Sequence, residues 1–417
     1  MRRQPRARTL KNTLLLVLIL TLYMDKRHPN KKILYIIPYF APAWSYGGPV
    51  KVAYDFAKKL QELGWEVSVA TTDVLNSRSR NNKQYEQIDG IRVFRFRNVN
   101  NKAARNLNLY SPIGLKKWLR QNINNYDVIH IHEFFTYQSI VASRLCKKLH
   151  KPYVIQPHGS LSQFCRRSRF GFIKNLIIKK FTPEAISCGA FIALNETEKR
   201  DIAKIYPQIK SKTKIVPNGL NLKEFEDTKP SNLHDRYTIK KESKIIAFIG
   251  RIHFKKGLDI SFEALALLKD TLDFTFLIIG PDEGEKNVLE KLAEKLGIKD
   301  RIIFAGLMSG TKKLETLKGA DLSLLNSRSE GLPTTLLESA ALGLPIICSP
   351  GSNLPEVSLF KAGFVVSGAE QTAQKIKLVL ADEKLRRSLS RNALRLSRHF
   401  DITSCAQKLN DVYRALL

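Results

Sequence analysis

Two glutamates in one short stretch could bind a ligand that is rich in hydroxyl groups. Glu330 and Glu338 stand eight positions apart in "SEGLPTTLLESAALGLPII", around the expected start of a helix. Proline suits the first turn of a helix, where its missing N–H breaks no hydrogen bond. The free backbone N–H groups of a helix N-terminus bind anions. The residues that would surround such an anion are Gly331, Leu332, Pro333 and Thr334. For either glutamate alone, a solvent-facing helix charge is the alternative.

Two cations follow another expected strand, in "FIGRIHFKKG". Arg251 offers a planar fork of N–H donors and Lys256 a compact charge, so together they could hold a diphosphate. The alternative is two surface cations in a chain that has 69 lysines and arginines.

Two glycines and one histidine lie at further strand ends. Gly47 and Gly48 precede an expected helix and would allow a phosphate or sugar to approach the backbone. They do not form the GxGxxG pattern, and a plain tight loop is the alternative. His158 ends the strand-like "YVIQPHGS", where packing or a cap is the alternative to catalysis.

A metal site is not predicted. His130 and His132 in "DVIHIHE" would share one face of a strand, and Glu133 follows them, but a convincing third ligand is missing. The five cysteines are scattered without a CxxC pair, which excludes the usual zinc spacing and favours a reducing compartment.

The elements that must position these residues alternate between strands and helices. "KILYIIPYF", "WEVSVATT", "IRVFRF", "DVIHIHE" and "YVIQPHG" are strand-like, and a second series restarts at "KIIAFIGRI". Such alternation predicts parallel sheets covered by helices, which bind ligands at the carboxyl ends of their strands. A chain of 417 residues is long enough for two such domains.

The predicted organisation has four parts. Residues 1–31 form a basic and apolar extension, which is either a membrane anchor, an uncleaved leader or sequence upstream of a true start at Met24. Residues 32–225 form the first domain and residues 226–395 the second. Residues 396–417 form a helix that packs back on the first domain.

The ordered motifs resemble the family-4 glycosyltransferases of the GT-B fold. The set is GG, HxHE, PHGS, "PNGLNLKEF", GRxxxxKG, "IIGPDEG" and E-x7-E followed by GLP, and it covers about residues 32–400. The resemblance implies two Rossmann-like domains facing a central cleft and a retaining transfer from a nucleotide-sugar co-substrate, with no required metal or other cofactor. The second domain would bind the donor, and the first domain the acceptor.

The resemblance also assigns roles. Arg251 and Lys256 would neutralise the leaving diphosphate. Glu330 would contact the transferred sugar, and His158 would lie beside it. The remaining positions are Glu338 at the ribose, Gly48 at the phosphate and Leu307 near the base. "GLPTT" replaces the commoner GFG after Glu330, which leaves the donor sugar unspecified.

The net charge of +31 favours an anionic partner. Residues 162–181 carry six cations and no acid, interleaved with apolar side chains, as in segments that lie on anionic membranes. We therefore expect an enzyme that transfers a hexose to a lipid-linked or polysaccharide acceptor in bacterial surface polysaccharide biosynthesis. It would work in the cytoplasm, peripherally attached to the inner membrane.

Two other functions compete with this one. An epimerase or hydrolase of nucleotide-sugars could use the same fold without an acceptor. A basic protein that binds nucleic acid would explain the charge, but the chain has no recognised nucleic-acid module, and carboxylates at the cleft would repel phosphate. We therefore predict no nucleic-acid partner.

Overall fold

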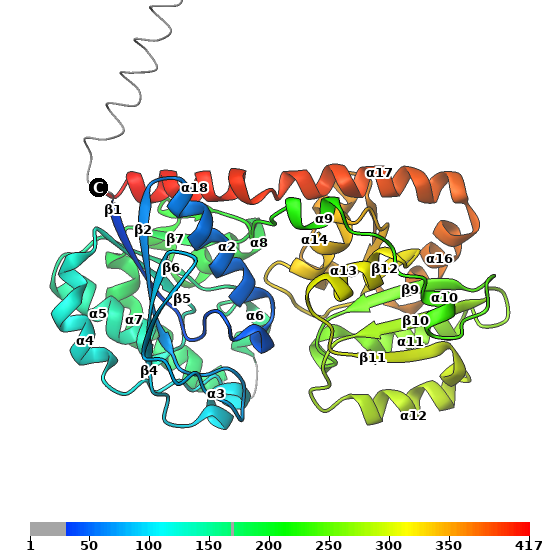
Figure 1. Ribbon diagram of the computed structural model, residues 1–417, viewed down its shortest axis with the longest axis horizontal. Coiled ribbons are helices and arrows are strands. Elements are labelled where there is room, and N and C mark those ends of the chain that lie inside the picture. The colour runs from blue at the N-terminus through cyan, green and yellow to red at the C-terminus, as the bar shows by residue number, and fades with distance from the viewer. Residues whose placement is uncertain (1–30, 168–170) are drawn as a thin grey trace, which may run out of the picture.

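The computed structural model describes residues 31–167 and 171–417. The apolar run between Leu14 and Met24 lies outside the described residues, so the three interpretations of the extension stay predictions. The described chain forms two α/β units side by side, joined by a pair of crossing segments (Figure 1).

The first unit contains an eight-stranded sheet in the order β3-β4-β2-β1-β5-β6-β7-β8. Its strands are β1 (Lys31–Ile36), β2 (Trp65–Thr72), β3 (Tyr85–Ile88), β4 (Ile91–Phe96), β5 (Val128–His132), β6 (Tyr153–Gln156), β7 (Ala190–Ala193) and β8 (Thr213–Ile215). Every pairing is parallel except that of β3 with β4.

Sequence analysis missed β3, which is short and alternates between exposed and half-buried residues. It pairs with β4 through a hairpin in which Asp89 and Gly90 both have positive φ, of 48° and 82°. An Asp-Gly pair between two strands is typical of such turns, so "QIDGIRV" contained the signal.

Helices cover both faces of the first sheet because its central strands are apolar on both sides. The helices here are α2 (Gly48–Glu62), α3 (Asn101–Leu107), α4 (Leu115–Asn122), α5 (Tyr137–Lys148), α6 (Gln163–Arg166), α7 (Gly171–Ser187) and α8 (Glu196–Ile205). One apolar core lies under α2 and a second under α4, α5 and α7.

The second unit contains a six-stranded, fully parallel sheet in the order β11-β10-β9-β12-β13-β14. Its strands are β9 (Lys244–Ile249), β10 (Phe274–Ile279), β11 (Ile302–Gly306), β12 (Leu322–Leu325), β13 (Ile346–Cys348) and β14 (Gly363–Val365). Its larger helices are α11 (Leu258–Ala266), α12 (Lys286–Leu296), α13 (Gly310–Lys318), α14 (Thr334–Ala341) and α16 (Gly368–Ala381). The predicted fold class, two doubly wound α/β domains, is confirmed.

The C-terminal helices join the two units. The first, α17 (Glu383–His399), packs on α14 of the second unit, and α18 (Ile402–Arg414) packs on α2 of the first (Figure 1). The predicted domain boundary at residue 395 falls within α17. The chain crosses between the units at Phe400–Ile402, where it exchanges backbone hydrogen bonds with Leu220, a residue of the other crossing segment.

The basic segment at 162–181 is not one amphipathic helix. Residues 168–170, which include Arg169 and Phe170, lie outside the described residues, and α6 and α7 flank them. At the start of α7, Phe172, Ile173 and Leu176 are exposed, whereas Phe181 is buried in the core. Within residues 31–167 and 171–417, no helix has both the length and the apolar character needed to cross a bilayer.

Candidate active site

The two units touch where the loop after β6 meets the loop after β12. His158 lies two residues beyond β6 with a φ of 53°, and Gly159 follows it. A Cβ on Gly159 would lie 3.0 Å from the Cα of Gly331, and a Cβ on Gly331 would lie 3.4 Å from the carbonyl oxygen of His158. A side chain at Gly159 would press on the backbone of Gly331, so the small size of these glycines allows His158 and the Glu330 loop to lie in close contact.

Two asparagines, one from each domain, donate to the Gly331 carbonyl at this contact, and the Asn195 bond crosses between the domains. The side chain of Asn195 donates to the carbonyl of Gly331 at 2.8 Å, and the side chain of Asn353 donates to the same oxygen at 2.9 Å. Asn195 also caps α8 by accepting from the backbone N–H of Glu198. Sequence analysis missed both asparagines. The N-cap pattern of "NETE" could have predicted the cap but not the contact with the other domain.

Glu330 forms a buried ion pair. Its carboxylate lies 2.7 Å from the ammonium of Lys256 and accepts a hydrogen bond from the Ser327 hydroxyl at 2.6 Å. The two charged side chains are only 13% and 12% exposed. Burial raises the pKa of Glu330, but the charges of Lys256 and Lys255 and these hydrogen bonds outweigh it, so the pKa is below its ordinary value. Glu330 is therefore ionised at neutral pH.

Lys256 reaches Glu330 because a tight turn follows it. The short 3-10 helix Phe254–Lys256 ends at Gly257, whose φ is 62°. A Cβ on Gly257 would lie 2.0 Å from the carbonyl oxygen of Asn326. Only glycine fits this approach between the loops after β9 and β12.

The other predicted donor residues are also paired with opposite charges. Glu338 accepts from the Lys313 ammonium at 2.7 Å, and its second carboxylate oxygen is buried without a protein partner. Arg251 is half exposed and pairs with Glu283 at 2.7 Å. Arg251 and Lys256, predicted to act together on a diphosphate, thus have separate acidic partners.

Gly48 approaches the second domain. Gly47 precedes α2 with a φ of 78°, and Gly48 is the first residue of the helix. A Cβ on Gly48 would lie 2.6 Å from the Thr334 hydroxyl oxygen. Thr334 begins α14, so Pro333 is one residue before the helix rather than in its first turn. The Gly-Gly loop therefore faces the helix N-terminus that was predicted to bind an anion.

Leu307 is a surface residue. It follows β11, and its side chain is 66% exposed. No contact in the described chain joins it to the other predicted residues, so its place near a base stays a prediction.

The histidines of β5 lie inside the first domain. The ring of His130 contacts the Tyr413 hydroxyl at 2.6 Å, and the ring of His132 contacts the ring of His158 at 2.9 Å. Burial lowers the pKa of all three histidines, that of His158 to about 4. No group of three histidine, cysteine or acidic side chains in the described part of the chain could hold a metal.

Two further acids border the site, the half-buried Glu133 and the buried Glu198, and sequence analysis assigned neither a role. Burial raises the pKa of Glu133 to about 8, and this residue follows β5 with a φ of 66°. Burial also raises the pKa of Glu198 to about 7, although this carboxylate accepts from the backbone N–H groups of Gly159 and Leu194. The HxHE motif indicated Glu133, but no sequence pattern indicates its burial.

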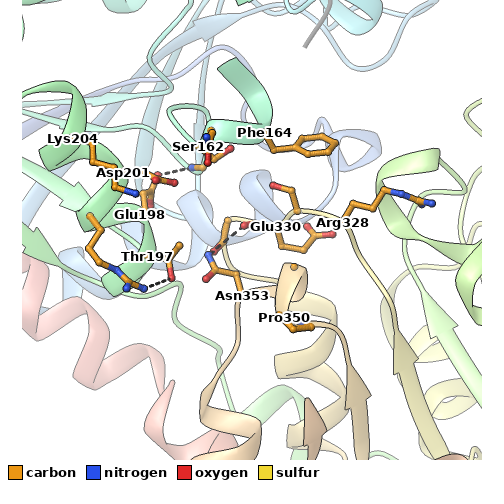
Figure 2. A pocket seen from close by; sticks show the side chains of 16 residues that line it. Ser162, Phe164, Thr197, Glu198, Asp201, Lys204, Arg328, Glu330, Pro350 and Asn353 are labelled. Atoms are coloured by element: carbon orange, nitrogen blue, oxygen red, sulfur yellow. Dashed lines mark hydrogen bonds between the residues drawn. The ribbon is translucent and has the colours of Figure 1, made fainter. Parts of the chain in front are cut away.

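A cavity of about 390 Å³ opens between the domains beside Glu330. Figure 2 shows Glu330 and Arg328 on one side and the α8 residues Thr197, Asp201 and Lys204 on the other, with Phe164 above. Its volume is in the range typical of small-molecule sites.

Two family models match the chain. "Glycosyltransferase Family 4" matches residues 46–224, and "Glycosyl transferases group 1" matches residues 231–395. Between them they cover most of the sequence. The chain is a family-4 glycosyltransferase.

Curated relatives agree with this family. An uncharacterized glycosyltransferase of Methanocaldococcus jannaschii is 24% identical over 75% of this chain and 80% of its own length. A D-inositol 3-phosphate glycosyltransferase of Xylanimonas cellulosilytica is 26% identical over 54% of this chain, which matches about half (56%) of that relative.

Solved structures share the fold of this glycosyltransferase. The sucrose-phosphate synthase of Thermosynechococcus elongatus is 19% identical with a TM-score of 0.71, over 93% of this chain and 99% of that one. HepE of Anabaena, in complex with UDP-glucose, is also 19% identical with a TM-score of 0.71, over 92% and 99% of the two chains.

Proposed function

We propose that this glycosyltransferase moves a hexose from a nucleotide-sugar to a lipid-linked or polysaccharide acceptor, with retention of anomeric configuration. The observation that carries the proposal is the buried pair of Lys256 and Glu330 at the point where His158 meets Gly331. A sugar attached to a diphosphate could bind at this domain contact. The fixed cation and the helix N–H groups would bind the diphosphate, and the carboxylate would bind the sugar.

The transfer breaks the bond between the anomeric carbon and the diphosphate and forms a bond from the same carbon to an acceptor hydroxyl. Negative charge builds on the leaving diphosphate. Lys256, Arg251 and the start of α14 would stabilise that charge, and a phosphate oxygen would take the acceptor proton. Glu330 is held ionised and would accept hydrogen bonds from sugar hydroxyls rather than remove a proton.

The first domain, which would bind the acceptor, would lie in the cytoplasm with the start of α7 against an anionic membrane. The support is the group of exposed apolar side chains at the start of α7, Phe172, Ile173 and Leu176, with Lys179 and Lys180 exposed on the same helix. Apolar insertion and about 1 kcal/mol of electrostatic attraction per cation would hold the protein at an anionic surface. A lipid-linked acceptor for surface polysaccharide would be reached there.

The first experiment measures release of nucleoside diphosphate by the full-length chain from UDP-, GDP- and ADP-sugars, with and without a bacterial lipid extract. We expect release from one donor that increases with the extract, and an NMR spectrum of the product should show the anomeric configuration of the donor. Release of free sugar that ignores the extract would replace the proposal with a hydrolase or epimerase. An inverted product would remove the retaining mechanism.

The membrane contact has a separate test. We expect Phe172→Ser with Ile173→Ser to reduce co-sedimentation with vesicles that contain phosphatidylglycerol. Leu359→Ser is the matched control, since Leu359 is a similarly exposed apolar residue (76%) on the second domain. Equal binding by both variants would contradict a membrane contact at α7.

A further inference from the structure

Four rings form a column from the C-terminal helix to the domain contact. The Tyr413 hydroxyl of α18 lies 2.6 Å from Nδ1 of His130. The rings of His130 and His132 stack with centroids 4.0 Å apart at 18°. Nδ1 of His132 lies 2.9 Å from Nε2 of His158, and these two rings are nearly parallel, at 10°.

Strand geometry and helix packing create this column. Side chains alternate along a strand, so His130 and His132 of β5 point to the same face of the sheet. The C-terminal helix packs on that side of the first domain and buries Tyr413 completely (Figure 1). Tyr35 of β1 packs edge-on against both histidine rings, at 5.1 and 4.7 Å between centroids, which fixes their planes.

The hydrogen bond between His132 and His158 has a direction. Burial lowers the pKa of both histidines, so each ring is neutral near pH 7 and carries one N–H. Nε2 of His132 is buried without a protein partner. A buried N–H group without an acceptor costs more free energy than a buried ring nitrogen without a donor. The proton of His132 is therefore on Nδ1. His132 then donates to Nε2 of His158, whose own proton is on Nδ1.

We propose that Tyr413 is a positioning residue for sugar transfer, acting through His130 and His132 to hold His158 in one orientation and in its Nδ1-protonated form. The inference rests on the proposed function, which places His158 beside the transferred sugar. The last turn of the C-terminal helix thereby becomes part of the catalytic apparatus, although it touches no substrate.

A ¹⁵N NMR spectrum of the histidine side chains in the full-length wild-type chain tests the protonation pattern. The His158 resonances are assigned by their loss in His158→Asn. We expect neutral His158 with its proton on Nδ1, and a population of the other form in Tyr413→Phe. Protonation of Nε2 in the wild type would overturn the proposal. This spectrum needs no donor, so it is independent of whether the proposed transfer is found.

Kinetics with the donor found above give the second test. Tyr413→Phe keeps the ring packed against Trp65 and removes only the hydroxyl. We expect kcat to fall about tenfold, as for other groups that orient a functional imidazole, with the donor KM unchanged. Asn410→Ala is the matched control, because it removes a buried hydrogen bond to Trp65 from the same helix without touching a histidine. We expect it to keep the wild-type kcat.

Equal losses of kcat in the two variants would show that the column serves packing alone, as would an unchanged kcat in Tyr413→Phe. If Tyr413→Phe does not fold, His130→Phe takes its place, since it keeps the stacked ring and loses the hydrogen bond. In either case, Nε2 protonation of His158 in the wild-type spectrum overturns the proposal, and Nδ1 protonation together with the loss of kcat in the variant supports it.

Discussion

The two walls of the domain contact are built from different chemistry. The wall from the second domain contains ion pairs, in which Glu330 and Glu338 are bound to Lys256 and Lys313. The wall from the first domain contains His158 on its column of neutral rings and Glu133, a half-buried acid whose raised pKa keeps it protonated near pH 7. At the contact itself, the second domain presents paired charges in fixed positions, and the first domain presents the neutral His158, with the charged α8 residues Asp201 and Lys204 farther along the cavity.

This difference matches what each wall would contact. A diphosphate needs fixed cations. A lysine buried without an acidic partner would have a lowered pKa and would tend to lose its positive charge. An acceptor hydroxyl needs oriented neutral groups that do not compete for the diphosphate, whereas Glu330 would accept hydrogen bonds from the donor sugar. The comparison predicts that substitutions in the charged wall have the largest effects on sugar transfer. It also predicts that a substitution in the first-domain wall changes how the stability of the fold depends on pH.

The largest effect is expected from Glu330→Gln and Lys256→Ala. Lys256→Ala removes a fixed donor at a developing anion, and such a loss typically costs about 10²–10³ in rate. Glu330→Gln removes the charge that holds Lys256 in place and would accept from the sugar hydroxyls, so release of nucleoside diphosphate should nearly vanish in both variants. Lys256→Ala also leaves a buried carboxylate unpaired, which should lower the free energy of unfolding by about 3–5 kcal/mol. Donor turnover and thermal unfolding measure these effects, with circular dichroism to check the fold.

Lys286→Ala is the control for this charge removal. Lys286 pairs with Glu290 at 3.6 Å on the surface of the same domain, where such pairs contribute little. Near-wild-type turnover in Glu330→Gln or Lys256→Ala would remove the assignment of the charged wall.

The next effect concerns the place where the walls meet. In Gly48→Ala the new methyl group would lie 2.6 Å from the Thr334 hydroxyl oxygen, so the Thr334 side chain or the Gly-Gly loop must shift. A shift near 1 Å can cost about 10² in kcat/KM. The double variant with Thr334→Ala should recover part of this loss, because 3.6 Å then separates the two Cβ atoms. Steady-state kinetics of the three variants measure the coupling, and additive losses would show that the contact is absent during turnover.

Glu338→Ala should have a smaller effect, on binding. One carboxylate oxygen is occupied by Lys313, and the second is buried without a protein partner; in the proposed function it would accept from a ribose hydroxyl. Loss of a hydrogen bond to a charged group should weaken binding of the nucleoside diphosphate roughly tenfold by calorimetry. Glu356→Ala, another acid with a buried unpartnered oxygen in the same domain, should leave binding unchanged. Unchanged binding in Glu338→Ala would make it an ordinary helix charge.

The smallest effect is a change in pH dependence. The pKa of Glu133 rises from 4.5 to about 8 on folding, so the folded protein binds more protons and its stability falls as pH rises through this range. Glu133→Gln should therefore reduce the drop in unfolding midpoint between pH 5 and pH 9. Glu198 has a pKa of about 7, so it should still cause part of the decrease in stability with pH in this variant. An identical slope in the variant would show that Glu133 is already ionised in the fold.

Much of this molecule could be predicted from local pattern. Strand–helix alternation predicted both sheets because a buried parallel strand must be apolar on both faces. The order of the short motifs predicted the family, since each motif follows a strand and parallel strands bring those ends to one edge. The exposed β3 was missed, because it departs from simple apolar periodicity.

The sequence by itself determined which residues lie at the strand ends and which charges are available there. Only the tertiary structure decided which of them are partners. Glu338 pairs with Lys313, Gly48 faces Thr334, and Tyr413 contacts His130 across 283 positions of sequence. Pairs so far apart have no periodicity that relates them, because their distance depends on how two domains and a crossing helix pack together. That packing set which candidate groups are buried and which groups they pair with. It therefore also set the direction in which each pKa is shifted.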